Sequence, residues 1–443
     1  MKTYLSVMLG RRVLVVCWGI AASAALAQGP RGPQAPQGPQ APQGPQGLVQ
    51  PQPTPLIVPQ PPAAVAPVPP TPVGPPAAQS RLGAALPGLS RAELTTFNEG
   101  GVEFRKTETV AGGLGPIFND VSCVACHSSG GVGGASQRTV TRFGRTVNGV
   151  FDPLDAQGGS LLQERSINPA IREIVPREAN TVARRVTTPL FGVGLIEAIS
   201  DSTIVLGTLR AKPAGIAGKV SVVRDVVSGK NLIGRFGWKA QQATLLAFSG
   251  DAYLNEMGIT NRFFPKENAP NGNMALLARF DLVADIEDEI DPLDGKADID
   301  RAAEFMRLLA PPTRGPATAS SSAGEAIFAR LDCAVCHTPA MTTGKHAIAA
   351  LSEKTVGLYS DLLLHDMGAL GDGIEQGTAG ARDMRTAPLW GLRARPTWLH
   401  DGRANTVDQA VRGHAGEAQR SRDRYVALSA AERQQLLDFL NTL

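Results

Sequence analysis

Between residue 86 and the C-terminus, hydrophobic residues recur mainly every three or four positions, the spacing of a helix with one buried face. Several of these runs begin with Ser followed three residues later by Glu, as at Ser90 and Glu93, which marks a helix N-terminus. The pattern predicts helices over 90–97, 240–257, 299–309, 322–331 and 429–443, and a short helix from Pro116 into Cys123. We therefore expect a mainly α-helical fold.

One region has the pattern of β-structure instead. Residues 220–223 and 231–234 are rich in Val, Ile and Leu, and Ser228 with Gly229 supplies a turn between them. We expect a small β-hairpin inserted into the N-terminal half.

The N-terminal 85 residues differ in composition from the rest. Residues 1–27 have basic residues, an apolar run and an Ala-x-Ala site, which is typical of a cleaved signal peptide. The apolar run is short for a membrane span, so we expect export to the periplasm and no stable membrane span after cleavage. Residues 28–85 are rich in Pro and Gln and predict a disordered, extended linker.

A Pro-, Gly- and Ser-rich stretch at 311–321 interrupts the helical pattern and predicts a second linker. It separates an expected N-terminal domain at 86–310 from an expected C-terminal domain at 322–443. The charge balance is nearly even, with 43 basic and 40 acidic residues, and indicates no nucleic-acid partner.

One five-residue motif, Cys-x-x-Cys-His, occurs once in each expected domain. The copies are Cys123-Val124-Ala125-Cys126-His127 and Cys333-Ala334-Val335-Cys336-His337. This motif is the attachment signal of c-type haem, in which both thiols bond to the haem and the histidine ligates the iron. The sequence therefore predicts two covalently bound haem c groups. Zinc or redox Cys-x-x-Cys pairs would leave both histidines and the leader unexplained.

The histidines are distributed unevenly between the two expected haems. None lies between His127 and His337, so the first iron has an open sixth position or a methionine there, with Met257, Met274 and Met306 as candidates. The C-terminal domain holds the other histidines. His414 follows Val407, Ala410 and Val411 on one predicted helical face and is our candidate distal ligand of the second iron, with His365 and Met367 as rivals.

Peroxide chemistry at an open iron needs a group that moves a proton between the two oxygen atoms. Without a distal histidine this group must be a carboxylate. Glu197 stands alone at the end of an apolar run, where burial would raise its pKa, and it is our catalytic candidate. Trp238 is a candidate electronic link between the haems or a packing residue, and His400 a candidate pocket residue.

Several motifs resemble the family of di-haem c-type oxidoreductases, which includes peroxidase-like and "thiol oxidoreductase" members related to bacterial di-haem cytochrome c peroxidases. The motifs are Gly113-Leu114-Gly115-Pro116-Ile117-Phe118-Asn119, Pro189-Leu190-Phe191-Gly192 through Glu197, Gly234-Arg235-Phe236-Gly237-Trp238-Lys239-Ala240, Thr386-Ala387-Pro388-Leu389-Trp390 and Leu399-His400-Asp401-Gly402-Arg403. The resemblance covers residues 88–443. It implies two cytochrome c-like domains, and a distal ligand fourteen positions after His400, which is His414.

These features lead us to expect a periplasmic peroxidase. It would reduce hydrogen peroxide or another small oxidant with electrons from a small donor, a cytochrome c or a cupredoxin. The alternatives are an oxidase or oxygenase of an organic or protein substrate, and a di-haem electron carrier without enzymatic activity.

Overall fold

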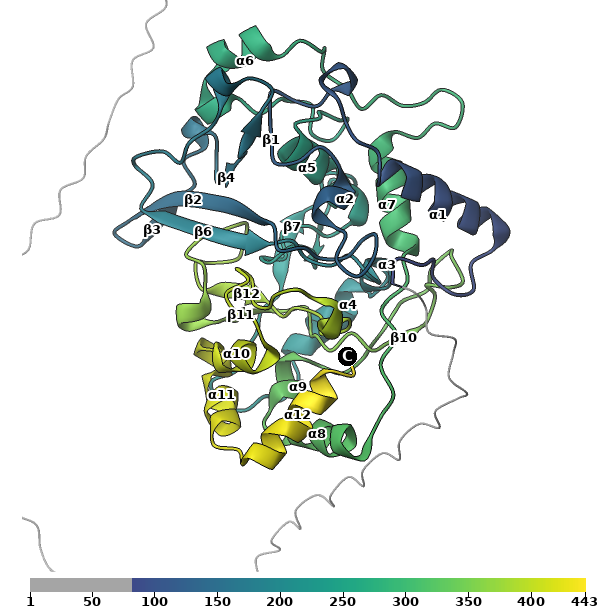
Figure 1. The fold of residues 1–443 in the computed structure, drawn as a ribbon, viewed down its shortest axis with the longest axis vertical. Helices are drawn as coiled ribbons and strands as arrows, with labels where there is room; N and C mark the ends of the chain where they lie inside the picture. Colours follow the sequence, from purple (N-terminus) through teal and green to yellow (C-terminus); the bar gives the residue numbers. More distant parts are fainter. Residues whose placement is uncertain (1–81) are drawn as a thin grey trace, which may run out of the picture. The chain divides into compact units, whose positions relative to one another are not determined.

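Two pairs of closely packed helices organise residues 82–443, the part of the chain that the computed structural model describes. α1 (Arg91–Glu103) packs on α7 (Asp298–Leu308), and α8 (Ala319–Arg330) packs on α12 (Ala430–Leu440) (Figure 1). The predicted leader and nearly all of the Pro-rich linker lie outside the described residues.

Each helix pair approaches closely because a glycine lies at the contact. A Cβ atom on Gly100 of α1 would stand 2.4 Å from the carbonyl oxygen of Arg301 in α7. A Cβ atom on Gly324 of α8 would stand 1.9 Å from the carbonyl oxygen of Gln435 in α12. Only glycine permits this approach, because it has no Cβ.

The other helices are shorter or lie between these pairs along the chain. They are α2 (Cys123–Cys126), α3 (Val193–Glu197), α4 (Asp201–Thr208), α5 (Leu245–Met257), α6 (Met274–Phe280), α9 (Cys333–Cys336), α10 (Val407–Arg412) and α11 (Gln419–Val426). Short 3-10 turns occur at Val110–Gly112, Asp155–Gln157, Pro169–Ile171, Pro270–Gly272, Gly368–Leu370, Leu392–Ala394 and Gly416–Ala418.

The structure contains more β-sheet than we expected. β2 (Thr139–Val147) is the centre of an antiparallel sheet and pairs with β3 (Val150–Asp152), β4 (Leu161–Leu162) and β6 (Thr181–Val186). Helices account for 34% and strands for 15% of the structure, so "mainly α" with one hairpin was too narrow a prediction. Polar residues and glycine fill most of β2, and its one large buried apolar side chain is Phe143. The alternation of apolar and polar residues that would indicate a strand is therefore weak in β2.

The remaining strands form two-stranded antiparallel ladders. The predicted hairpin is confirmed as β7 (Ser221–Arg224) paired with β8 (Asn231–Gly234). The other pairs are β1 (Ile117–Phe118) with β5 (Arg165–Ser166), β9 (Met341–Thr342) with β10 (Thr355–Val356), and β11 (Leu364–Asp366) with β12 (Asp383–Arg385).

Helix starts were predicted well where a side chain caps the helix. Ser90 and Ser429 both form the expected reciprocal bonds with a Glu three residues later. The predicted start at Ser322 was wrong, because Thr318 and Ser321 cap α8 four residues earlier. The predicted helix at Pro116 was also wrong: the residues after it form β1, and the helix begins at Cys123.

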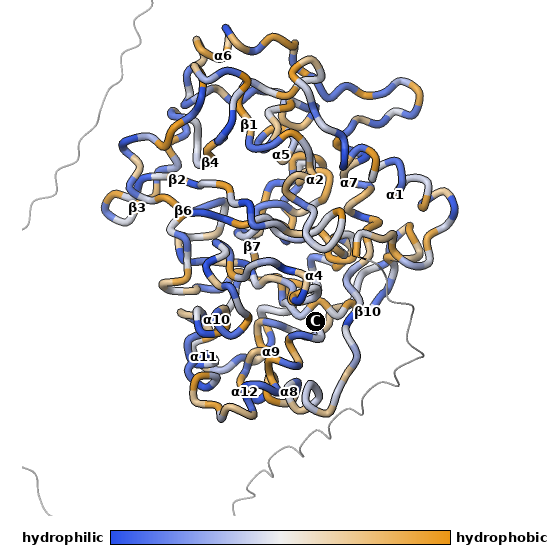
Figure 2. Tube along the Cα trace, viewed as in Figure 1, coloured by the Kyte–Doolittle hydropathy of each residue, from blue (hydrophilic) through white to orange (hydrophobic). Residues whose placement is uncertain are grey.

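The hydrophobic core does not follow the predicted domain boundary. Its largest cluster joins Ile196 and Ile204 of the N-terminal half to Leu351 and Leu363 of the C-terminal half. Hydrophilic residues predominate in the long loop that leads into α7 (Figure 2). The domain limits at 86–310 and 322–443 stay a prediction.

Candidate functional site

Each Cys-x-x-Cys-His segment forms one helical turn beside a cavity. In α2 and α9 the two thiols are three residues apart and therefore share a helix face. The cavity lined by Cys123, Cys126 and His127 is called the first cavity below, and the cavity lined by Cys333, Cys336 and His337 the second cavity.

The histidine of each motif has its ring orientation set by a backbone carbonyl. The Nδ1 atom of His127 donates to the Gly134 oxygen at 3.2 Å, and that of His337 to the Tyr359 oxygen at 3.1 Å. This leaves Nε2 as the ligand nitrogen, an arrangement common among metal-bound histidines. Burial lowers the pKa of each ring to about 4, so both are neutral, as a metal ligand must be.

A phenylalanine stands beside each of these histidines. The Phe104 ring lies 6.1 Å from His127 and 4.7 Å from Phe305 in α7. The Phe328 ring lies 6.4 Å from His337 and 5.2 Å from Phe439 in α12. The helix pair, the aromatic contact and the motif thus recur as one unit in the two halves of the chain.

His414 faces His337 across the second cavity. Their ring centres are 6.4 Å apart at an interplanar angle of 63°. Two imidazoles that bind one metal ion from opposite sides stand about 6.3 Å apart, given metal–nitrogen bonds of about 2 Å. His414 donates from Nδ1 to the Ala410 oxygen at 2.8 Å, and burial lowers its pKa, so its Nε2 is also suited to ligation. The geometry supports His414 as the second ligand.

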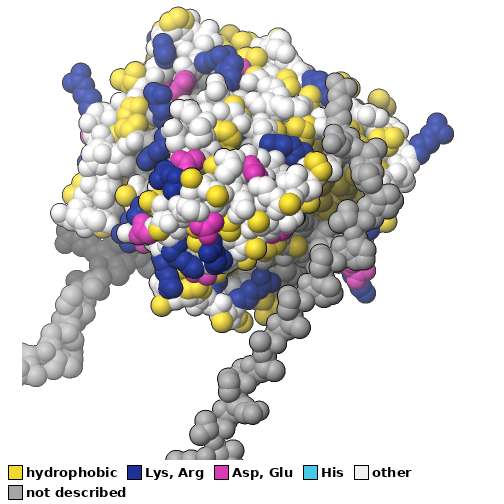
Figure 3. Space-filling model, turned by 60° about the horizontal axis from the view of Figure 1, so that its bottom comes forward, with side chains coloured by type: hydrophobic (Ala, Val, Ile, Leu, Met, Phe, Trp, Pro, Cys, Tyr) yellow, Lys and Arg dark blue, Asp and Glu magenta, His cyan; other side chains and the backbone are white. Residues whose placement is uncertain are grey.

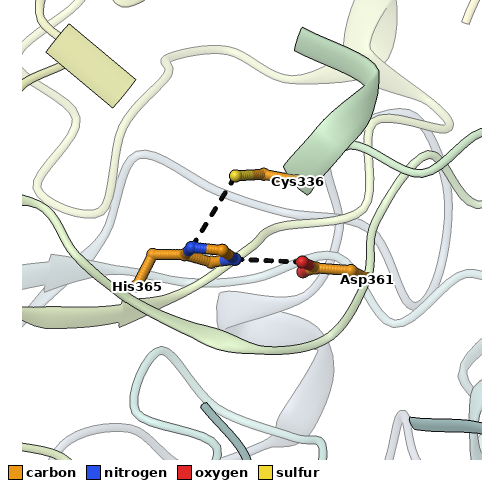
Figure 4. A group of neighbouring side chains, drawn as sticks. All are labelled: Cys336, Asp361 and His365. Atoms are coloured by element: carbon orange, nitrogen blue, oxygen red, sulfur yellow. Dashed lines mark hydrogen bonds and ion pairs between the residues drawn. The ribbon is translucent and has the colours of Figure 1, made fainter. Parts of the chain in front are cut away.

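His365 lines the same cavity but is engaged on both ring nitrogens. Nε2 lies 2.9 Å from the Asp361 carboxylate, and Nδ1 lies 3.7 Å from the Cys336 sulfur (Figure 4). Nδ1 also lies 2.7 Å from the Glu417 carboxylate. Burial would lower its pKa, but these hydrogen bonds outweigh it and raise the pKa to about 12. His365 is therefore an imidazolium and is unsuited to bind iron. Met367 also lines this cavity.

The first cavity has no second histidine among the described residues that line it. Met257 and Met306 are in its wall, whereas Met274 is 66% exposed on α6 and lies outside it. The first site therefore offers one histidine and two thioethers. The second site offers an opposed pair of imidazoles.

Glu197, our sequence candidate for the acid–base group, lines neither cavity. Its carboxylate accepts bonds from Arg307 Nε at 2.7 Å and from the backbone N–H of Leu245 at 2.7 Å. It joins α3 to α7 and caps the start of α5. The Glu197 side chain is 16% exposed rather than fully buried, and the structure gives this acid a structural task.

Three acids line the first cavity, Asp120 and two on α5. Glu256 and Asp251 lie on α5, and burial raises the pKa of each carboxyl group. Glu256 shares one helical face with Ser249, Ala252 and Tyr253, all of them cavity residues. Sequence reasoning missed the two acids on α5, although their spacing along the predicted helix at 240–257 could have located them.

Arginines in both cavities fit an anionic group such as the propionates of a haem. In the second cavity, burial lowers the pKa of Arg385 and Arg395 to about 10, and neither forms an ion pair within the described residues. In the first cavity, Arg142 has an unpartnered buried Nε and Arg185 an unpartnered Nη2. Arg185 also pairs with Asp372, and Arg385 and Arg395 donate to backbone carbonyls, but an unpartnered buried N–H is costly and calls for an acceptor. Thiols, neutral histidines and arginines with spare donors together fit a haem.

Trp238 lines both cavities. Its indole N–H donates to the Val186 oxygen at 2.9 Å, and its ring lies 6.3 Å from that of His400. His400 is 4% exposed and lines the second cavity, in agreement with its assignment as a pocket residue. The bridging position of Trp238 could not be derived from its sequence context.

One face of the protein carries a mixture of charged and hydrophobic side chains. On the face drawn in Figure 3, Lys and Arg side chains lie beside Asp and Glu, with hydrophobic groups scattered among them. Among the described helices, none combines the length and hydrophobicity needed to cross a membrane.

Solved structures with partial similarity include hydrazine synthase of Kuenenia stuttgartiensis, which is 13% identical with a TM-score of 0.36. The match covers 86% of this chain and 99% of that chain. The diheme peroxidase BthA of Burkholderia thailandensis E264 is 14% identical with a TM-score of 0.35, and the match covers 79% of this chain and 86% of that chain. A MauG-like protein associated with microbial copper homeostasis is 16% identical with a TM-score of 0.30, and the match covers 57% of this chain and 89% of that chain. No curated protein matches the chain.

A family model described as "Di-haem oxidoreductase, putative peroxidase" matches residues 164–443, which is more than half of the chain. The matched region includes the second motif, His414 and the α5 acids Asp251 and Glu256. The match agrees with the paired Cys-x-x-Cys-His cavities and with the resemblance of the motifs. The chain belongs to the di-haem oxidoreductase family, and membership implies two haem groups.

Proposed function

We propose that this protein is an exported, periplasmic peroxidase that reduces hydrogen peroxide with electrons from a small donor protein, a cytochrome c or a cupredoxin. The observation that carries the proposal is the difference between the cavities. The second holds two opposed imidazoles, whereas the first holds one imidazole, three carboxyl groups and two arginines. An iron with both axial positions filled can pass electrons, and an iron with one open position can also bind peroxide.

In this proposal the four cysteines form thioether bonds to the two haems, and His127, His337 and His414 ligate the irons. When bound, the haem of the first cavity supplies the redox-active iron for peroxide reduction. Trp238 stands between the two cavities and is placed to carry electrons from the second to the first.

Glu256 is our candidate for the group that moves the peroxide proton. Of the three acids that line the first cavity, Asp120 is tied to Arg138 and Arg165 by ion pairs. Glu256 accepts one side-chain hydrogen bond, from Asn119 Nδ2 at 2.8 Å, and burial raises the pKa of its carboxyl group above the usual value, the direction that favours a proton-carrying acid. Arg142 lines the same cavity and can stabilise the negative charge that develops on oxygen.

Rapid-mixing kinetics with peroxide and a reduced cytochrome c test this proposal on the haem-loaded full chain. Glu256→Gln should lower the rate about 10²- to 10⁴-fold, the usual contribution of a general acid–base group. Glu197→Gln is the matched control and should keep the rate within a few-fold, because Glu197 lies outside both cavities.

Electron paramagnetic resonance distinguishes the alternatives. The ferric wild type should show one high-spin and one low-spin haem. Two low-spin haems that ignore added peroxide would indicate an electron carrier. Oxygen uptake with an organic or protein substrate, without peroxide turnover, would indicate an oxidase or oxygenase.

A further inference from the structure

A group of charged side chains lies where α1 ends against α7. Lys106 Nζ is 2.7 Å from the Asp298 carboxylate, 3.1 Å from that of Glu108 and 3.7 Å from that of Glu103. The three carboxylates offer oxygen atoms that all lie within 4.8 Å of one another, a spacing that could also hold a metal ion. The Lys106 ammonium binds all three and supplies the positive charge that they need.

Tyr253 connects this group to the first cavity. Its hydroxyl donates to Glu103 Oε1 at 3.0 Å, while the residue is 2% exposed and lines the first cavity. Glu256 follows three residues later on the same face of α5 and lines the same cavity. Neighbours at this spacing have Cβ atoms about 5–6 Å apart. Glu103 is therefore hydrogen-bonded to Tyr253, and Tyr253 and Glu256 lie one turn apart in the wall of the first cavity.

Glu103 is suited to exchange protons near neutral pH. Burial, followed by repulsion from Asp298, raises its pKa to about 7, although Lys106 and the bond from Tyr253 oppose the shift. Burial raises the pKa of Tyr253 well above its usual value, so its hydroxyl stays protonated. This hydroxyl can therefore pass a proton on but cannot store a negative charge. The ionisable groups that face Glu103 or this tyrosine are Lys106, Glu108, Cys123, Tyr253, Asp298 and Arg301.

We propose that Glu103 and Tyr253 form the route by which protons enter the first cavity and reach Glu256. This inference rests on the proposed function, because peroxide reduction consumes protons. One hydrogen peroxide takes up two electrons from the donor protein and two protons from solvent, its O–O bond breaks, and two water molecules form. Glu103 takes a proton at the surface, and the Tyr253 hydroxyl passes it inward.

The test is a redox titration of the haem-loaded full chain at a series of pH values, without peroxide. Reduction makes the first haem more negative. The Glu103 carboxyl group should therefore take up a proton when this haem is reduced. The potential of the first haem should fall with rising pH between about 6 and 8, and Glu103→Gln should abolish this slope.

Peroxide turnover provides the second measurement. Glu103→Gln and Tyr253→Phe should each lower the rate at least tenfold at pH 7, with unchanged haem content. Tyr253→Phe keeps the ring in the cavity wall and removes only the hydroxyl. Glu99→Gln, an exposed acid one turn earlier on α1, is the matched control and should match the wild type in both measurements.

The outcomes separate this inference from the proposed function. A slope that persists in Glu103→Gln, or turnover that is unchanged in Tyr253→Phe, overturns the proton route even if the enzyme reduces peroxide. A slope that depends on Glu103 in a protein that ignores peroxide supports proton uptake through Glu103 and overturns the peroxidase proposal.

Discussion

His127 and His337 have the same local sequence and similar rings, both neutral and both bonded to a carbonyl through Nδ1. Their difference comes from the opposite side of each cavity. His414 faces His337 at 6.4 Å, while the described wall of the first cavity contains no second histidine. At the scale of single residues, the difference between the two cavities therefore rests on His414, which lies just beyond the end of α10.

Replacing His414 tests this difference directly. His414→Gly should convert the low-spin haem signal to high-spin and leave the signal of the other haem unchanged, since only the second cavity loses a ligand. Electron paramagnetic resonance of the ferric protein measures the change. His346→Gln, at a histidine outside both cavities, is the control. An unchanged spectrum in His414→Gly would rule out His414 as a ligand.

The Glu417–His365 pair predicts a pH dependence of stability. Hydrogen bonds raise the pKa of His365 from its usual 6.5 to about 12, although burial alone would lower it. Hydrogen bonds donated to the Glu417 carboxylate lower the pKa of Glu417 from 4.5 to about 2, although burial alone would raise it. The folded state holds the His365 proton more tightly than the unfolded state, so this stabilisation declines as pH rises above 6.5. The folded state holds the Glu417 proton less tightly, so this stabilisation declines as pH falls below 4.5.

The contribution of the pair should therefore be greatest between pH 4.5 and 6.5. Denaturant unfolding of the wild type and of His365→Gln at pH values from about 3 to about 9 measures it as the difference in unfolding free energy, which should decrease on both sides of this window. A difference that does not vary with pH would contradict the ion pair.

At the scale of elements, glycines and caps decide how the helices meet. Gly100 and Gly324 allow the two close helix contacts, and Thr318 rather than Ser322 starts α8. Glu197 belongs to this scale as well, because its carboxylate holds α3, α5 and α7 together.

Removing the charge of Glu197 should loosen this junction. We expect Glu197→Gln to lower the free energy of unfolding by about 1–3 kcal/mol, the typical value of a hydrogen bond to a charged group. Chemical denaturation of the haem-loaded chain measures the change. Loss of peroxide turnover in a variant that remains folded would contradict the structural task assigned to Glu197.

At the scale of the whole described region, a buried ion-pair network joins the two halves. Asp372 binds Arg185 Nε at 2.7 Å and Lys239 Nζ at 2.9 Å, and all three side chains are at most 4% exposed. Arg185 also lines the first cavity, and Trp238, the residue before Lys239, lines both. The network therefore supports the wall that the two cavities share.

Asp372→Asn would leave two buried cations without a charged partner. We expect a loss of about 3–5 kcal/mol in unfolding free energy, the usual cost of breaking a buried pair from one side. Asp152→Asn, in an exposed pair with Arg145, should cost less than about 1 kcal/mol and is the control in the same denaturation experiment. Equal effects of the two substitutions would contradict a stabilising network.

The sequence by itself determined the features that depend on neighbours along the chain. Both Cys-x-x-Cys-His turns, the caps at Ser90 and Ser429 and the hairpin at 221–234 could be derived without a structure. The helix before His414 was also predicted, but α10 ends at Arg412, so His414 lies two residues beyond it. Local hydrogen bonds and side-chain spacing encode these features, so a short window of sequence is sufficient.

Only the tertiary structure decided which residues share a cavity. It replaced Glu197 with Glu256 as the candidate acid, placed Trp238 between the cavities and engaged His365 with Asp361 and Glu417. These relations join positions far apart in the chain through packing and charge pairing. The burial that changes the pKa of a carboxyl group or an imidazole exists only after the chain has folded.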